Sequence, residues 1–196
     1  MVRSHAIQWL PVAEEDPAPG TFQAVLSALE HPGVVVHLPK YNGSPWPLNS
    51  ASAALLTTWF NPETPVWTDL CWDSDPAAWL QRTCACSLVT EPCMARVAFV
   101  ADPLRIPPLG QFYHGEDDRP ERSTTLIWQV PGFSVPNGRR RDVSGKGRSL
   151  KARPTGLPLR FWSDWDNQRR YLPFGIDVFF TCVDTMVALP RGLQLT

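Results

Sequence analysis

Lysine and net charge are both scarce in this sequence. Of its 18 basic residues only Lys40, Lys146 and Lys151 are lysines, and the formal net charge is −1. Few amines are therefore present for Schiff-base chemistry, and no overall positive field attracts nucleic acid or anionic lipid. The chain also lacks the G-x-x-x-x-G-K-[ST] pattern and a G-x-G-x-x-G pattern after a strand. These absences argue against nucleic-acid binding and against two common nucleotide-binding folds.

Long apolar segments are also missing. No run approaches the roughly 18 to 20 residues that span a bilayer. The first residues do not form the apolar core of a signal peptide, because Glu14, Glu15 and Asp16 follow soon after Val12. We therefore expect a cytoplasmic protein with no membrane partner. The 196 residues suit a single domain, residues 1–196. The five cysteines, an odd number, are expected to stay reduced.

Apolar periodicity predicts alternating helices and strands. Phe22, Val25, Leu26 and Leu29 fall at i, i+3, i+4 and i+7, which predicts one buried helix face with Thr21 as N-cap. The whole pattern favours an α/β fold that ends in an antiparallel hairpin. Further helices are predicted at 51–60 (capped by Asn49 or Ser50), 75–82 (capped by Asp75) and 163–171 (capped by Ser163), and strands at 34–38, 64–68, 95–100, 124–130, 176–182 and 186–189.

Clustered cysteines raise the question of a metal site. Cys84, Cys86 and Cys93 follow the spacing C-x-C-x6-C, and Cys71 or His114 would be needed to complete four ligands. Without a C-x-x-C pair, packing in the core is the favoured interpretation. No histidine is placed beside a cysteine as a base. We therefore predict neither a metal ligand set nor a catalytic residue.

A basic, glycine-rich stretch occupies residues 139–153. Guanidinium groups bind phosphate in a bidentate manner, and glycine-rich backbone offers N–H donors. The stretch therefore suits a polyphosphate ligand, RNA or an acidic partner, or else it is a solvated hairpin.

Asp177 stands out because it lies in an otherwise apolar segment. The strand predicted at 176–182 shows no alternation, which is typical of burial on both faces. A buried carboxylate requires a partner. Arg191 is one candidate, since the strands at 176–182 and 186–189 are expected to pair. Asp177 is thus either a structural ion pair or a ligand contact.

Several segments resemble the PhnH family and occur in the same order along the chain as in that family. The family provides one component of the bacterial carbon–phosphorus lyase system. The sharpest is Pro173-Phe174-Gly175-Ile176-Asp177, here called the signature segment. The other segments are 22–33, with its Pro-Gly break, 47–56, 62–67, 120–126, 145–147 and 188–191.

The resemblance implies a fold and an assembly. The implied fold is a three-layer α/β/α mixed sheet, similar to pyridoxal-phosphate-dependent transferases but without the cofactor. The family implies a homodimer that joins subunits G, I and J in a cytosolic core complex. That complex attaches methylphosphonate to the ribose C1 of ATP, forming ribose 1-methylphosphonate 5-triphosphate.

The PhnH component is expected to be an accessory, non-catalytic part of this transferase complex. The alternative is an independent small enzyme or binding protein for a phosphorylated small molecule, and an RNA-binding module is disfavoured by the net charge. The residues proposed for ligand binding or assembly are Asp177, Gly175, Arg191, Glu63, Thr64 and Arg148.

Overall fold

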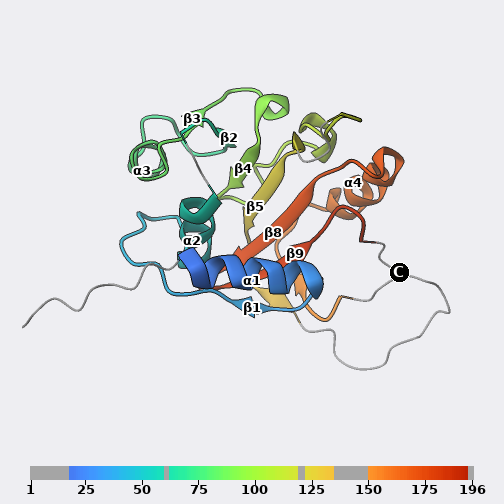
Figure 1. Ribbon diagram of the computed structural model, residues 1–196, viewed down its shortest axis with the longest axis horizontal. Helices are drawn as coiled ribbons and strands as arrows, with labels where there is room; N and C mark the ends of the chain where they lie inside the picture. Colours follow the sequence, from blue (N-terminus) through green and yellow to red (C-terminus); the bar gives the residue numbers. More distant parts are fainter. Residues whose placement is uncertain (1–17, 60–61, 119–121, 135–149, 194–196) are drawn as a thin grey trace, which may run out of the picture.

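The computed structural model describes residues 18–59, 62–118, 122–134 and 150–193. Its centre is a seven-stranded sheet in the order β1-β9-β8-β5-β4-β2-β3, flanked by helices (Figure 1). The strands of this sheet are β1 (Val36–His37), β2 (Pro65–Thr68), β3 (Ser87–Leu88), β4 (Val97–Val100), β5 (Thr125–Gln129), β8 (Asp177–Cys182) and β9 (Thr185–Leu189). The helices are α1 (Ala18–Glu30), α2 (Ser50–Trp59), α3 (Asp75–Thr83) and α4 (Phe161–Asn167), with 3-10 turns η1 (Pro92–Met94), η2 (Leu109–Gln111) and η4 (Gln168–Tyr171).

The sheet is mostly parallel. Strands β3, β2, β4, β5 and β8 run in one direction, and β9 folds back beside β8 as an antiparallel hairpin. β1 then pairs with β9 at the edge. The predicted α/β class and the C-terminal hairpin are therefore confirmed. β6 (Phe133–Ser134) and β7 (Arg153–Pro154) form a separate antiparallel pair, and residues 135–149 between them lie outside the described residues.

Each face of the sheet has its own core. Phe99, Ile127 and Phe179 point toward α1 and α2 in one cluster. Their neighbours along the strands point the other way, where Trp128 and Phe180 pack against α4 in a second cluster. Side chains alternate across a strand, so continuous apolar runs in β4, β5 and β8 are what a sheet with helices on both faces requires. The predicted burial of residues 176–182 on both faces is confirmed from Val178 to Thr181.

Helix α2 begins where the sequence predicted. The Asn49 side chain is the cap, since its Oδ1 accepts a hydrogen bond from the backbone N–H of Ser52 at 2.8 Å. Leu55 and Leu56 are fully buried, and Trp59 packs edge-on against Phe179 with ring centroids 4.8 Å apart. These contacts attach α2 to the centre of the sheet.

The buried face of α1 agrees with the prediction at Val25 and Leu29 and differs at Phe22 and Leu26. Thr21 is not a cap but lies inside the helix, buried together with Ala24, Val25 and Ala28. Phe22 and Leu26 are instead 53% and 46% exposed. The small residues face the sheet because they let the helix approach closely. Two large apolar side chains of the expected core are thus left on the surface.

Two other caps also require correction. The cap of α3 is Ser74 rather than Asp75, because the Ser74 hydroxyl accepts the N–H of Ala77. Ser163 lies inside α4, which begins at Phe161 and has no side-chain cap of its own. The cap position shifts by one residue in α3 and by three residues in α4, where it falls on Arg160.

Candidate functional site

Strand order reverses between β2 and β4. From β2 the chain passes through α3 to β3 on one side, then returns to β4 on the other side of β2. In open parallel sheets, ligands bind outside the carboxyl ends of the strands at such a switch point. A ligand site is therefore expected beside the residues that follow β2 and β4.

A cavity of about 570 Å³ opens at this position and is here called the switch-point pocket. Its size falls in the range of roughly 300 to 1,000 Å³ that is usual for small-molecule sites. Its wall combines apolar side chains with a few carboxylates, one thiol and one guanidinium. The lining residues are Trp46, Pro47, Asp69, Leu70, Cys71, Ser74, Asp75, Pro76, Ala101, Asp102, Pro103 and Arg105.

Asp69 connects the two strands that form the pocket. Its carboxylate oxygens accept the backbone N–H groups of Ala101 at 2.8 Å and Asp102 at 2.9 Å. Burial raises the pKa of Asp69, and these two hydrogen bonds oppose the rise. Both oxygens already have partners, so Asp69 shapes the pocket floor rather than offering a free ligand contact.

The turn between β2 and α3 forms another wall. The Cys71 thiol donates to Asp73 Oδ1 at 2.8 Å, and the Ser74 hydroxyl donates to the Cys71 carbonyl. The thiol hydrogen bond lowers the pKa of Asp73. No histidine lines this pocket among the described residues. The arrangement therefore suits binding better than nucleophilic catalysis, which would require a base beside the thiol.

Trp46 and Arg105 provide the most distinctive groups at the rim. The Trp46 side chain is 89% exposed, which is unusual for the largest apolar residue. Arg105 is the only basic residue among the pocket's described lining. An aromatic ring and a guanidinium that line one cavity can hold a flat or anionic group.

The signature segment lies elsewhere, at the amino end of β8. Asp177 and Arg191 form the expected ion pair, in which Asp177 Oδ1 accepts the Arg191 backbone N–H at 2.7 Å and Arg191 Nε lies 3.1 Å from Oδ2. Arg191 Nη2 also donates to Oδ2. Each side chain is 21% exposed. The pair closes the β8–β9 hairpin, because Asp177 begins β8 and Arg191 follows β9.

Gly175 stands beside this pair for a steric reason. Its φ of +132° is strained for any L side chain, and a Cβ there would lie 3.1 Å from Gln168 Oε1 and 3.3 Å from Arg191 Cβ. The structure thus brings three of the predicted site residues together, namely Gly175, Asp177 and Arg191. None of them lines the switch-point pocket.

The remaining predicted residues lie apart. Glu63 and Thr64 precede β2, which is separated from β8 by β5 and β4 in the sheet. The Thr64 carbonyl accepts the N–H of Ser87, which helps to align β2 with β3. Lys151 and Arg153 of the basic stretch are exposed. Arg148, with residues 139–149, lies outside the described residues.

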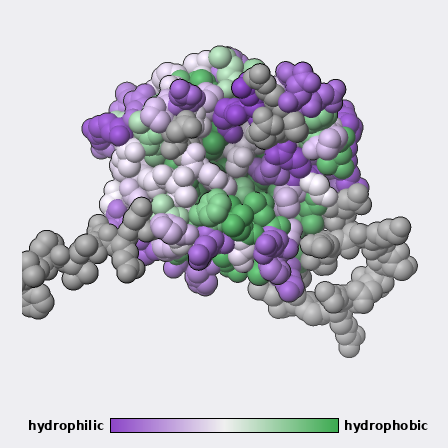
Figure 2. Space-filling view, viewed as in Figure 1, coloured by the Kyte–Doolittle hydropathy of each residue, from purple (hydrophilic) through white to green (hydrophobic). Residues whose placement is uncertain are grey.

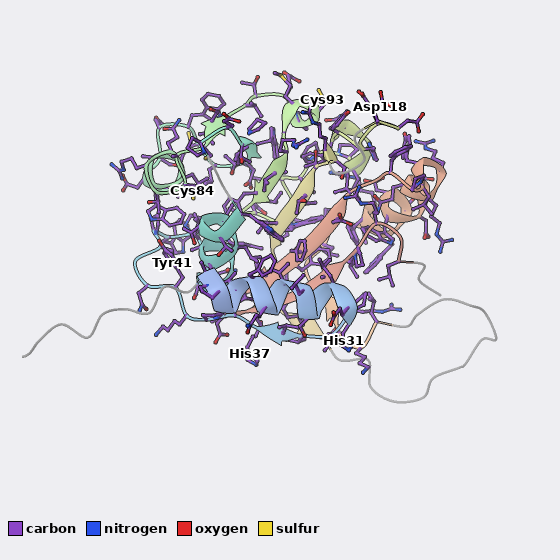
Figure 3. The ribbon with its side chains drawn as sticks, viewed as in Figure 1. His31, His37, Tyr41, Cys84, Cys93 and Asp118 are labelled. Carbon is purple, nitrogen blue, oxygen red and sulfur yellow. The ribbon has the colours of Figure 1, made fainter. Side chains whose placement is uncertain are left out.

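The cysteines are spread over several elements. Cys84 and Cys86 are buried beyond the end of α3, and Cys93 is exposed in η1 (Figure 3). Burial raises the pKa of the Cys84 thiol to about 12, so this side chain packs as a neutral thiol. Within the described ranges, no three histidine, cysteine, aspartate or glutamate side chains gather as a metal site. His31 and His37 are exposed.

Sequence reasoning missed the residues of the switch-point pocket. A signal was present, since Asp69-Leu70-Cys71 directly follows one predicted strand and Ala101-Asp102 directly follows another. What the pattern could not show was that these two strands are neighbours.

Among the described helices, none combines the length and apolarity needed to cross a bilayer.

Comparison with known proteins extends over nearly the whole chain. The family model described as bacterial phosphonate metabolism protein (PhnH) matches residues 14–196. A curated relative is the alpha-D-ribose 1-methylphosphonate 5-triphosphate synthase subunit PhnH of Rhizobium meliloti (strain 1021). It is 28% identical over 183 residues, which cover 91% of this chain and 90% of the relative. The family match includes both the switch-point pocket and the Asp177–Arg191 pair.

Proposed function

This chain belongs to the PhnH family of bacterial phosphonate metabolism proteins, and we propose that it acts as the PhnH component of a ribose 1-methylphosphonate 5-triphosphate synthase in the carbon–phosphorus lyase pathway. The observation that carries the proposal is the family match over residues 14–196, together with a relative of that name aligned over 90% of its own length. The expected family assignment is thereby confirmed.

Within that assembly we assign the chain an accessory role. It would form a homodimer and join subunits G, I and J in a cytosolic complex. The absence of a histidine beside Cys71 in the described pocket lining supports a binding or structural role over a chemical one. The paired Asp177 and Arg191 support the same view, because their charges are used in closing the terminal hairpin.

The surface of α1 supports an intersubunit contact. Apolar side chains gather over this helix in Figure 2. Phe22 and Leu26 belong to this face, and Val35 beside β1 is 36% exposed. Exposed apolar patches commonly mark protein–protein contacts. We propose that a second copy of the chain covers this face.

Co-purification tests the assembly. The chain is co-expressed with tagged subunits G, I and J, and it should elute with them in fixed stoichiometry. Deletion of its gene should also abolish growth on methylphosphonate as the sole phosphorus source. A chain that remains outside the complex when all subunits are soluble contradicts the proposal.

The homodimer face has its own test. Leu26→Glu places a charge in the proposed contact and should shift the mass measured by light scattering from dimer to monomer. Gln81→Glu adds the same charge to an exposed position of α3 and should leave the dimer intact. Equal masses for both variants would show that α1 does not form the contact.

The switch-point pocket favours a second candidate function, which is binding of a phosphorylated small molecule by the chain itself. Arg105 and the start of α3 face this cavity, and both suit an anionic group. Thermal shift with ATP tests it. Arg105→Ala should remove the shift, whereas Arg82→Ala, an exposed arginine at the far end of α3, should retain it.

The finer description of the fold is also a proposal. We infer that the fold is a three-layer α/β/α sheet related to that of pyridoxal-phosphate-dependent transferases. This chain itself would not carry the cofactor. Lys40 and Lys151, the two described lysines, are exposed and do not line the switch-point pocket. This placement supports a chain that forms no Schiff base. Titration with pyridoxal phosphate should give no imine absorbance, and appearance of that band would contradict the inference.

A further inference from the structure

A second, smaller cavity lies behind the signature segment. Its volume is about 190 Å³, and its wall includes a histidine, two amides and an arginine. That space is about six times the roughly 30 Å³ that one water occupies in the liquid, so it accepts a compact polyatomic ion. The lining groups that matter chemically are His114, Asp164, Asn167, Gln168, Arg170 and Tyr171.

Gln168 supplies a buried donor. The residue is 3% exposed, and its Oε1 accepts the backbone N–H of Ile176 at 2.9 Å. That bond fixes the orientation of the amide, because the opposite orientation would set an NH₂ group against an N–H. Gln168 Nε2 then has no hydrogen-bond partner among the described residues. A buried donor without a partner costs roughly 1 to 3 kcal/mol, so a ligand acceptor here is favoured.

His114 supplies an acceptor on the same cavity. Its Nε2 is also buried and has no partner in the described part of the chain. Burial lowers the pKa of His114, while a hydrogen bond to the Phe112 carbonyl acts in the opposite direction. A neutral ring that donates to Phe112 through one nitrogen presents a lone pair on the other. The ring is held by Tyr171, whose centroid lies 4.2 Å away.

Arg170 supplies the positive charge. Its guanidinium lies 4.9 Å from the centre of the Tyr171 ring, and its charge contributes to the lowered pKa of His114. Among the described wall residues the one carboxylate, Asp164, pairs with Arg160, with Nε and Oδ2 3.5 Å apart. The cavity therefore combines a cation, a fixed N–H donor and a lone-pair acceptor.

We propose that this cavity, here called the signature pocket, binds a small oxyanion that still carries a proton, of the phosphate or phosphonate class. Its P–OH group would donate to His114 Nε2, and its charged oxygens would accept from Gln168 Nε2 and from Arg170. An oxyanion without a hydroxyl fills only the two donor contacts and leaves His114 unsatisfied. The pocket thus selects an oxyanion that carries a proton as well as a negative charge.

Backbone N–H groups of the signature segment hold residues of this pocket in place. The Gly175 N–H donates to the His114 carbonyl at 2.9 Å, and the Ile176 N–H holds Gln168. A side chain at position 175 would meet Gln168 Oε1 at 3.1 Å. Gly175 and Ile176 are therefore positioning residues, and the ligand contacts come from His114, Gln168 and Arg170.

Calorimetric titration of the full chain at pH 7.5 tests the proposal with three probes: sodium phosphate, methylphosphonate and sodium sulfate. Phosphate retains a hydroxyl at this pH and sulfate does not. Phosphate should bind at least about tenfold more tightly than sulfate, which corresponds to one hydrogen bond. Methylphosphonate should gain affinity as the pH is lowered to 6.5, where more of it carries the proton.

Variants identify the pocket. Arg170→Ala should weaken phosphate binding about tenfold or more, and Arg169→Ala, its exposed neighbour outside the pocket lining, should not. Gln168→Glu keeps the acceptor for Ile176 but removes the donor, and should abolish binding. Arg105→Ala reports on the switch-point pocket and should leave the titration unchanged. This experiment needs no other component of the complex, so its result is separate from the co-purification test.

Three outcomes would overturn the proposal. The first is no heat of binding with any probe at 10 mM, at ~25 °C, which would mean that the pocket holds only water. The second is equal affinity for phosphate and sulfate, which would remove the role of His114. The third is equal binding by the Arg170→Ala and Arg169→Ala variants, which would place the anion elsewhere on the surface.

Discussion

The switch-point pocket lies beyond the carboxyl ends of β2 and β4, whereas the signature pocket lies beside the amino end of β8. The two pockets differ in how their polar groups are used. In the switch-point pocket the partly buried carboxylate of Asp69 already has two backbone partners. In the signature pocket, Gln168 and His114 each keep one buried nitrogen without a described partner. Topology therefore locates the first pocket, whereas unsatisfied polar atoms define the ligand chemistry of the second. Variants that disturb one pocket and spare the other test whether the two are independent.

The largest effect is expected from Asp177→Ala. The change leaves Arg191 without its carboxylate and removes the bonds that close the terminal hairpin, so the free energy of unfolding should fall by about 3 kcal/mol. Urea denaturation measures this loss. Asp184→Ala, whose pair with His37 is largely exposed, is the control and should cost much less. A wild-type melting temperature together with intact partners would contradict a structural role for Asp177.

Gly175→Ala should come next. The positive φ and the close contact with Gln168 predict a loss of about 2 kcal/mol in unfolding free energy. Because Gln168 must move, phosphate binding should be lost while a ligand shift that depends on Arg105 remains. Gly43→Ala is a useful control: its φ is +83° but nothing lies within 4 Å of the added Cβ. Equal losses of phosphate binding in both variants would contradict the positioning role.

Asp69→Ala should lower the free energy of unfolding by a smaller amount, about 1 to 2 kcal/mol, since two backbone N–H groups lose their acceptor near solvent. The loops after β2 and β4 should then separate more readily. Hydrogen exchange should increase at Ala101 and Asp102 and stay unchanged at Ile176. Faster exchange at both ends of the sheet would mean that the two pockets are mechanically coupled.

The smallest effect concerns pH. Burial lowers the pKa of His114 below its ordinary value of 6.5, so the unfolded chain takes up a proton more readily than the folded chain. Stability should therefore decline as the pH falls through and below about 6.5, and His114→Gln should remove that part of the decline. Urea midpoints at pH 7.5 and 5.5 measure it. His31→Gln, at the exposed end of α1, should retain the wild-type change.

Patterns along the chain predicted local elements better than faces and sites. The strand at 176–182 and a helix cap at Asn49 or Ser50 follow from neighbouring residues, because burial and capping act over a few positions. The face of α1 was predicted correctly at Val25 and Leu29 but wrongly at Phe22 and Leu26. Both are as apolar as a core requires, and only the packed sheet shows that smaller residues occupy their place. Large apolar residues on a helix can serve an interface as well as a core, and periodicity alone does not separate the two.

The sequence by itself determined the α/β class, the C-terminal hairpin and the need for a partner at Asp177, because these depend on hydrophobic pattern and on the cost of burying charge. The segments that resemble PhnH also lie in the sequence, and they were sufficient to identify the family. Only the tertiary structure placed the end of β2 beside the end of β4, and His114 beside Gln168. These contacts join residues far apart in the chain, and no local pattern specifies which distant segments become neighbours in a sheet.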